Sequence, residues 1–228
     1  MVEIMSKMLM GSDITELYSP SRANTLMRQF GIETGVAVNL TRGYDFSKQE
    51  DRRTVWGYMK EKRPLFLISS DSHTDVGVRG QTQRKWDDEI KHHEFCMRLY
   101  KEQAKHGRYF VHEQAIAKGV WNLECTREVG RQEGTVTVRA DHITTKGKGE
   151  VRNQRTQTRV MTNAPLVAVE ISKDHKGATR EGPPKRLPVA LGTSICRGML
   201  KQNMCDKDKV RPVGKINQLR QIRPEDVK

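Results

Sequence analysis

Apolar and polar residues alternate in short blocks along the first half of the chain, and these blocks predict strands and helices in turn. The clearest block is the apolar run 65–68, which follows Pro64 and stops at the polar run 69–74. A short, continuous apolar run between turn signals is typical of a strand buried on both faces. Because ligands in open α/β sheets bind beyond the carboxyl ends of such strands, we expect a functional site in the loop 69–75.

Two further strands are expected before this one, at 14–18 and 35–40, with helices at 22–30 and 47–62. Strands that alternate with helices predict a parallel sheet with crossover helices. The later expectations, in chain order, are helix 86–105, strand 108–113, a helix from about 121 to 130, strand 135–138, a polar loop at 144–158, strand 159–163 and helix 194–204. The expected fold is therefore α/β and Rossmann-like, with a mostly parallel sheet and flanking helices.

The organisation expected is one domain with a segment on either side. Residues 1–12 are interpreted as a flexible lead-in, 13–205 as the α/β domain and 206–228 as a disordered basic tail without apolar periodicity. Residues 176–228 hold 13 Lys and Arg against 5 Asp and Glu. The positive charge therefore gathers toward the C-terminal end.

The net charge of +13 favours an anionic partner, most often nucleic acid. DNA is favoured over RNA, and the candidate contacts are Arg152, Arg155, Lys185 and Arg186. No run of about 18 apolar residues occurs, as a membrane-spanning helix would require. The N-terminal residues also lack the apolar segment of a secretory signal, so we expect an intracellular protein, nuclear or cytoplasmic, without a membrane partner.

The four cysteines give no sign of a metal site or a disulfide framework. They are Cys96, Cys125, Cys196 and Cys205. No two form a C-x-x-C pair, and none stands at zinc-ligand spacing from a histidine. Reduced thiols and no bound metal are therefore expected.

Polar groups at the ends of the predicted strands suggest a nucleotide-like cofactor. The first strand ends at 16–20, where Glu16 is followed by a predicted turn and then a helix. An acidic residue before a tight turn and a helix is a common arrangement for binding such a cofactor. Asn39 and Asp45 follow the second strand, where ribose hydroxyls are usually held. Glu113 ends the fourth strand, where a carboxylate could bind or protonate a base ring.

Six motifs follow one another in a particular order along the chain. They are Glu-Leu-Tyr-Ser-Pro-x-Arg at 16–22, Asn-Leu-Thr-x-Gly-Tyr-Asp-Phe at 39–46, Arg-Pro-Leu-Phe-Leu-Ile-Ser-Ser at 63–70, Gly-Arg-Tyr-Phe-Val-His-Glu-Gln at 107–114, Thr-Arg-Val-Met-Thr-Asn at 158–163 and Ser-Ile-Cys-Arg-Gly at 194–198. Together they resemble the cytosine-5 DNA methyltransferase fold, in the divergent form found in retrotransposon-type polyproteins beside reverse transcriptase or integrase segments. The resemblance runs from about 13 to 200.

This resemblance implies S-adenosylmethionine as the cofactor and gives each matching position a role. The residues that would line or read the cofactor are Glu16, Tyr18, Ser19, Asn39, Asp45 and Ser69. In this set Asn39 would hold the ribose and Asp45 would read the adenine. Glu113 would touch a cytosine flipped out of the duplex, and Arg159 would lie near that base or its phosphate.

The sequence departs from the family in the loop after the strand 65–68. There the family reads Ser-Pro-Pro-Cys, and the thiolate attacks C6 of the base. Here Asp71 and Ser72 align with the prolines, and His73 aligns with the cysteine. Because an imidazole is a poorer nucleophile for this addition, we expect the fold to survive and cytosine methylation to be lost.

Three interpretations of function stay open at this point. The first is a degenerate, inactive methyltransferase-like domain of a retroelement, still in contact with nucleic acid and with other segments of its polyprotein. The second is an active transferase that uses S-adenosylmethionine, in which His73 or Asp71 serves a different acceptor. The third is a basic nucleic-acid-binding or interaction protein that takes no cofactor and binds through residues 176–228.

Overall fold

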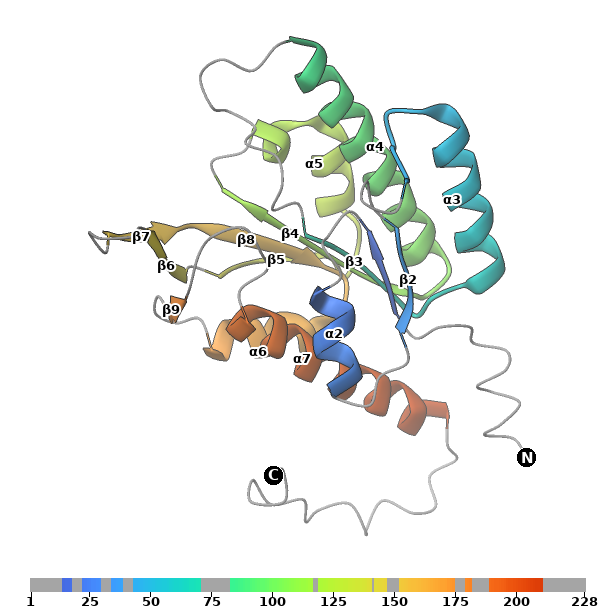
Figure 1. Cartoon of the computed structure of the whole chain (residues 1–228). Helices are drawn as coiled ribbons and strands as arrows, with labels where there is room; N and C mark the ends of the chain where they lie inside the picture. Colours follow the sequence, from blue (N-terminus) through green and yellow to red (C-terminus); the bar gives the residue numbers. More distant parts are fainter. Residues whose placement is uncertain are drawn as a thin grey trace.

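Strands and helices alternate over the first half of the chain, as the sequence predicts, in the computed structural model of the protein (Figure 1). The structure describes residues 14–17, 22–29, 34–38, 43–70, 83–116, 119–140, 142–146, 152–174, 179–181 and 189–210. The strands are β1 Ile14–Leu17, β2 Thr34–Val38, β3 Phe66–Ser70, β4 Tyr109–Ala115, β5 Val136–Arg139, β6 His142–Lys146, β7 Arg152–Thr156, β8 Thr158–Thr162 and β9 Thr179–Glu181. The helices are α2 Arg22–Gln29, α3 Gln49–Lys62, α4 Gln83–Lys105, the 3-10 turn η2 Gly119–Asn122, α5 Glu124–Gly130, α6 Pro165–Asp174 and α7 Val189–Val210.

Six strands form the central sheet in the order β2-β1-β3-β4-β8-β5. Strands β1, β2, β3 and β4 pair in parallel, whereas β8 runs antiparallel to both of its neighbours, β4 and β5. The expectation of an α/β, Rossmann-like fold with a mostly parallel sheet is therefore confirmed.

Helices cover both faces of this sheet, and the alternation of side chains along each strand decides which face a residue serves. Helices α2, α6 and α7 lie on one side, and α3, α4 and α5 lie on the other (Figure 1). Strand β3 shows the division, because Phe66 and Ile68 belong to the core beneath α6 and α7, while Leu67 belongs to the core beneath α3 and α4. Each of the three is at most 2% exposed, so the predicted two-sided burial of this strand is confirmed.

The predicted polar loop at 144–158 is wrong, because β6 and β7 occupy most of it. The two strands pair antiparallel from His142 opposite Thr156 to Lys146 opposite Arg152, and β9 pairs with β6 in parallel to complete a second, three-stranded sheet. Strands β6 and β7 continue the pair formed by β5 and β8. Their pairing comes from backbone hydrogen bonds to a neighbouring strand, and the sequence gives no apolar alternation by which to detect it.

The C-terminal part of the fold has one helix that was not expected and a second that is longer than expected. The apolar stretch 167–171 lies inside helix α6, which starts at Pro165, a residue whose fixed φ suits the first position of a helix. Helix α7 runs to Val210, so the boundary of the tail at 206 is wrong by several residues. The C-terminal turns of α7 lack apolar periodicity, so the sequence pattern predicts an end at 204, before the observed end at Val210. Residues 1–12 and 211–228 lie outside the described residues.

Candidate functional site

The carboxyl ends of β1 and β3 lie side by side near the middle of the sheet. Leu17 is level with Ser69, and β2 pairs with the other side of β1. Strands β2 and β3 lie on opposite sides of β1, so the strand order reverses its direction at β1. The carboxyl edge between β1 and β3 is therefore the topological switch point of the sheet. Ligand-binding crevices in open α/β sheets form at such points. Of the predicted cofactor residues, Ser69 lies directly at this edge and is buried.

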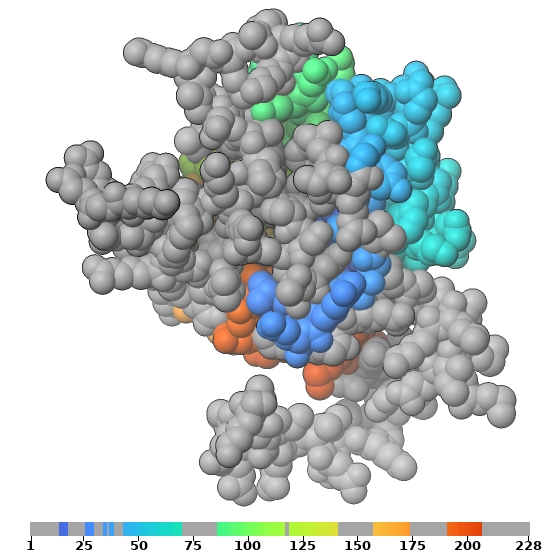
Figure 2. Space-filling view, in the orientation of Figure 1, coloured from blue at the N-terminus to red at the C-terminus, as the bar shows by residue number. Residues whose placement is uncertain are grey.

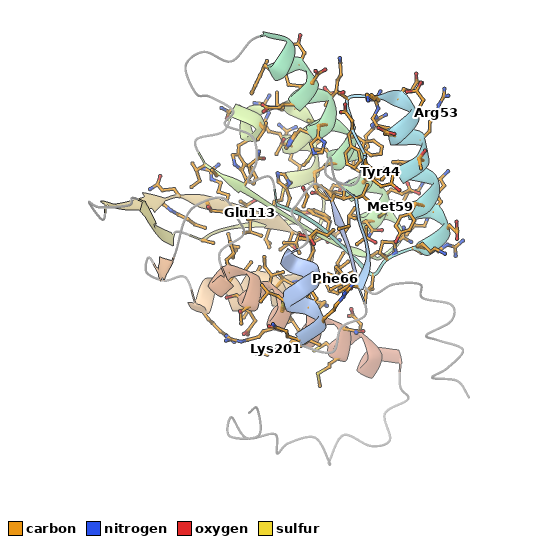
Figure 3. The ribbon with its side chains drawn as sticks, in the orientation of Figure 1. Tyr44, Arg53, Met59, Phe66, Glu113 and Lys201 are labelled. Atoms are coloured by element: carbon orange, nitrogen blue, oxygen red, sulfur yellow. The ribbon has the colours of Figure 1, made fainter. Side chains whose placement is uncertain are left out.

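Two predicted carboxylates, Glu16 and Glu113, project from the same face of the sheet. Glu16 is level with Ile68, Glu113 is level with Ser70, and β3 separates the two strands. Because side chains alternate along a strand, both carboxylates face the side of α2, α6 and α7, and Glu113 is labelled in Figure 3. Glu16 is fully buried and Glu113 is 6% exposed. Two buried carboxylates therefore stand two strand spacings apart and two residues out of level, roughly 12 Å from each other, next to the switch point.

Arg159 does not share that face. It is level with Gln114 on β4, whereas its neighbour Val160 is level with Glu113. Arg159 and Glu113 therefore project to opposite faces of the sheet. The guanidinium carbon of Arg159 lies 5.9 Å from the ring centre of Trp121, on the side of α4 and α5. The structure does not bring Glu113 and Arg159 together around one base.

A buried chain of polar side chains, which no sequence pattern predicts, runs beside this edge. The ring nitrogens of His112 lie 3.2 Å from the Tyr100 hydroxyl, at Nδ1, and 3.1 Å from Oε1 of Gln114, at Nε2. An amide oxygen only accepts, so Nε2 carries the proton and Nδ1 accepts from the Tyr100 hydroxyl. The ring of His112 is thus held in one orientation by a partner at each nitrogen. The available signal was a histidine that directly follows the run Tyr109, Phe110 and Val111 in the same strand.

Two more histidines lie in the same layer of the core, on α4. Nε2 of His93 donates to the Thr126 hydroxyl over 2.6 Å, and that hydroxyl donates to the Val120 carbonyl over 2.7 Å. His92 stacks on Phe46 with ring centres 4.9 Å apart. Burial lowers the pKa of His92 to about 3, although the nearby Asp45 charge acts in the opposite direction. His92 is therefore neutral near pH 7 and serves packing.

Asp45 has a structural task in the turn that enters α3. Its Oδ1 accepts a hydrogen bond from the Ser47 backbone over 3.0 Å, and its own backbone N–H donates to Oδ2 of Asp51 over 2.9 Å. Burial by itself would raise the pKa of Asp45, but the hydrogen bonds from Ser47 and the charge of Lys48 outweigh it and lower that pKa. Such an aspartate turn explains the residue without a ligand. Its predicted contact with adenine stays a prediction.

The other predicted site residues lie wholly or partly outside the described residues. Those that are not described at all are Tyr18, Ser19, Asn39, His73, Lys185 and Arg186. Arg152 and Arg155 lie on β7, where the backbone is described but the side chains are not. The roles expected for these eight residues stay predictions.

The cysteines stand away from the carboxyl end of β3, where the family places its nucleophile. Cys96 is buried on α4, Cys125 lies on α5, and Cys196 and Cys205 lie on α7. Burial raises the pKa of the Cys125 thiol and raises that of Cys196 to about 12. A thiol with a raised pKa is a weak nucleophile near neutral pH.

The described residues contain neither a candidate metal centre nor a membrane-spanning helix. No group of three or more His, Cys, Asp and Glu side chains among them could hold a metal ion. Likewise, none of the helices that the structure describes combines the length and the apolar character needed to cross a bilayer.

Comparison with known proteins gives limited similarity. No protein-family model and no curated protein matches the chain. Among solved structures, a precorrin 8W decarboxylase from Methanobacterium thermoautotrophicum and a precorrin-6y C5,15-methyltransferase from Geobacter metallireducens each align with 71% of this chain, at 10% identity and a TM-score of 0.31. The alignments cover 87% and 84% of those two chains. Similarity at this level carries no argument about the ligands of this protein.

Proposed function

We propose that the chain is a methyltransferase-like domain that binds S-adenosylmethionine at the carboxyl edge of its sheet and has lost cytosine methylation. The observation that supports it best is the switch point between β1 and β3, with the buried carboxylates of Glu16 and Glu113 on one face of the sheet there and Ser69 on the other. A carboxylate at the end of the first strand is suited to accept hydrogen bonds from an ammonium group or from hydroxyls of the cofactor. When bound, this cofactor supplies an activated methyl group.

The loss of cytosine methylation follows from the missing thiol. The loop after β3 carries His73 where the family carries its cysteine, and residues 71–82 contain no cysteine. The family reaction needs a thiolate that adds to the base and makes its C5 nucleophilic. The four cysteines of this chain lie on α4, α5 and α7, so they offer no substitute at this edge.

The proposal includes contact with nucleic acid through the ribbon formed by 136–146 and 152–162. Arg139 on β5 lies directly opposite Arg159 on β8. Two guanidinium groups side by side on one face of a ribbon offer the forked donors that suit a phosphate group. Arg152 and Arg155 lie further along the same ribbon, and Lys185 and Arg186 are candidates from the sequence. A two-stranded ribbon fits the major groove of B-DNA but not the narrow major groove of RNA, which supports DNA as the partner.

The origin in a retroelement, and other segments of a polyprotein as partners, rest on the six sequence motifs alone. A second candidate function is a basic interaction protein without a cofactor, which the net charge of +13 favours. The two differ in one measurable property, which is the binding of S-adenosylmethionine.

The test is isothermal titration of S-adenosylmethionine into the full chain and into two variants. Glu16→Gln removes the buried carboxylate without changing its size, and Glu50→Gln removes an exposed carboxylate on α3. We expect binding near the micromolar range, which corresponds to about 8 kcal/mol. Glu16→Gln should weaken it tenfold or more, and Glu50→Gln should leave it unchanged.

Two outcomes would contradict this proposal. Absence of binding by a chain whose circular dichroism shows it to be folded would favour the cofactor-free interaction protein. Equal binding by the two variants would place the cofactor away from Glu16. If binding is found, methyl transfer to DNA should be absent from the natural chain, and its detection would contradict the loss of catalysis and favour a transferase that uses His73 or Asp71.

A further inference from the structure

A second pocket lies at the opposite end of the sheet from the candidate site, between the C-terminal halves of α3 and α4. Its volume is about 420 Å³, which is within the range of small-molecule sites. The residues that line it are Trp56, Met59, Lys60, Arg63, Leu99, Glu102, Gln103, His106 and Arg108. Met59 and Arg53, labelled in Figure 3, mark the inner and outer sides of α3, and α3 itself forms one flank of the molecule in Figure 2. Because it lies at the amino ends of β3 and β4, this pocket is separate from the switch point.

Three cations border the pocket with few internal partners. Arg108 donates from Nε to Oε1 of Gln103 over 2.6 Å, and Arg63 donates from Nε to the Lys60 carbonyl over 3.4 Å. Within the part of the chain that the structure describes, neither guanidinium forms an ion pair, and Lys60 lies 5.9 Å from the Trp56 ring centre without one. The terminal nitrogens of both guanidinium groups are therefore left for a ligand.

Arg108 is held in place by its neighbour. The side chain of Gln103 donates from Nε2 to the Pro64 carbonyl over 2.9 Å and to the Tyr109 carbonyl over 3.2 Å. Both amide protons are used in this way, so Oε1 must face Arg108. Burial lowers the pKa of the Arg108 guanidinium, and the charge of Arg63 acts in the same direction against that of Glu102. Two guanidinium groups thus line one pocket, Arg108 in a fixed position, with the Glu102 carboxylate beside them.

The backbone at Arg63 is a second, independent observation. Arg63 follows α3 with a φ of 45°, and it is the sole non-glycine residue with positive φ among the described residues. Glycine is the usual residue at this left-handed position after a helix, and a larger side chain there costs about 1 kcal/mol. A costly conformation that a protein retains points to a role for the side chain.

We propose that this pocket binds a phosphorylated nucleoside. Arg63 and Arg108 supply the forked donors that suit a phosphate, and Lys60 adds a point charge. Trp56, Met59 and Leu99 supply an apolar wall for a flat ring. The Glu102 carboxylate accepts hydrogen bonds from a ring amine or a sugar hydroxyl. The same chemistry is offered by a free mononucleotide and by the 5′-phosphorylated end of a nucleic-acid strand.

The test uses the full chain, thymidine 5′-monophosphate and thymidine, with binding followed by isothermal titration. We expect the monophosphate to bind and thymidine not to bind. Arg63→Gly removes the guanidinium and suits the left-handed backbone, so the fold should be kept, which the urea midpoint checks. This variant should lose affinity tenfold or more. Lys105→Gln removes the same charge from an exposed site on α4 outside the pocket and should change affinity less than twofold.

Two oligonucleotides, with and without a 5′-phosphate, distinguish the sources. Tighter binding of the phosphorylated strand than of the monophosphate, with the same dependence on Arg63, identifies a strand end. Binding of the monophosphate alone identifies a free nucleotide. The proposal is overturned if neither phosphate ligand binds, if Arg63→Gly behaves like Lys105→Gln, or if S-adenosylhomocysteine displaces the monophosphate, which would place it at the switch point. Apart from the displacement by S-adenosylhomocysteine, these results do not depend on whether S-adenosylmethionine binds.

Discussion

The two faces of the central sheet are built from different chemistry. The face beneath α2, α6 and α7 is mainly aliphatic, and its buried residues include Ile14, Ile68, Val111, Val160, Val167, Ile171, Leu191 and Ile195. The face beneath α3, α4 and α5 combines aromatic rings with buried histidines, namely Phe46, Phe95, Tyr100, Phe110, His92, His93 and His112. Beneath these three helices the first face is packed by shape, and its buried carboxylates, Glu16 and Glu113, lie near the carboxyl edge of the sheet. The second also depends on hydrogen bonds and on protonation, so the two faces should respond differently to substitution and to pH.

The aliphatic face should be the more sensitive to an added methyl group where α6 and α7 meet. A Cβ at Gly198 would lie 2.4 Å from the Val167 Cα and 2.9 Å from the Val167 nitrogen. Both are backbone atoms, so the helices must move apart. Gly198→Ala should lower the free energy of unfolding by about 3 kcal/mol, measured by urea denaturation.

The matched control lies on the other face, in the middle of α3. A Cβ at Gly57 meets nothing within 4 Å. Gly57→Ala should therefore raise the free energy of unfolding by about 0.5–1 kcal/mol, since alanine favours a helix more than glycine does. Equal effects of the two substitutions would show that the close contact between α6 and α7 is not important for stability.

The histidine face should make the protein sensitive to acid. The pKa of His92 is about 3 in the folded state and near 6.5 when unfolded, so the unfolded chain binds the proton more readily. The stability that its neutral form provides is complete above pH 6.5 and is lost as the pH falls toward 3, with a slope of up to about 1.4 kcal/mol per pH unit. The lowered pKa of Asp45 adds to the loss at the acid end of this range.

Urea denaturation between pH 7 and pH 5 measures this slope. His92→Gln should flatten it, because glutamine does not titrate. Identical slopes for the natural chain and His92→Gln would show that His92 does not govern the acid response.

A smaller loss of stability than at Gly198 is expected within the polar chain of Tyr100, His112 and Gln114. Tyr100→Phe removes the hydroxyl that donates to Nδ1 of His112 and should destabilise the protein by about 1–2 kcal/mol. The ring of Tyr100 still stacks on Phe110, so packing is kept. ¹⁵N resonances of His112 should report a changed tautomer balance, a signal that a loss of packing would not produce. Tyr44→Phe, at a partly exposed tyrosine, is the matched control.

Local patterns in the sequence were enough for the order of elements. The apolar run before Ser69 identified β3, and the three- and four-residue spacing from Trp86 to Tyr100 identified α4, because each pattern depends on residues that are neighbours in the chain. The absence of a cysteine after β3 is likewise a fact of the sequence. Strands β6 and β7 were missed because each is stabilised by pairing with the other, and neither has an apolar pattern that the sequence would show.

What the sequence by itself determined is therefore the α/β class, the succession of strands and helices and the polar groups at strand ends. Only the tertiary structure decided that β8 lies antiparallel between β4 and β5, which sends Glu113 and Arg159 to opposite faces. It also decided that Arg63 and Arg108 border one pocket although 44 positions separate them in the chain. The physical reason is that the spacing of apolar residues in a segment is a local property of the chain, whereas strand register and helix packing depend on contacts between distant parts of it.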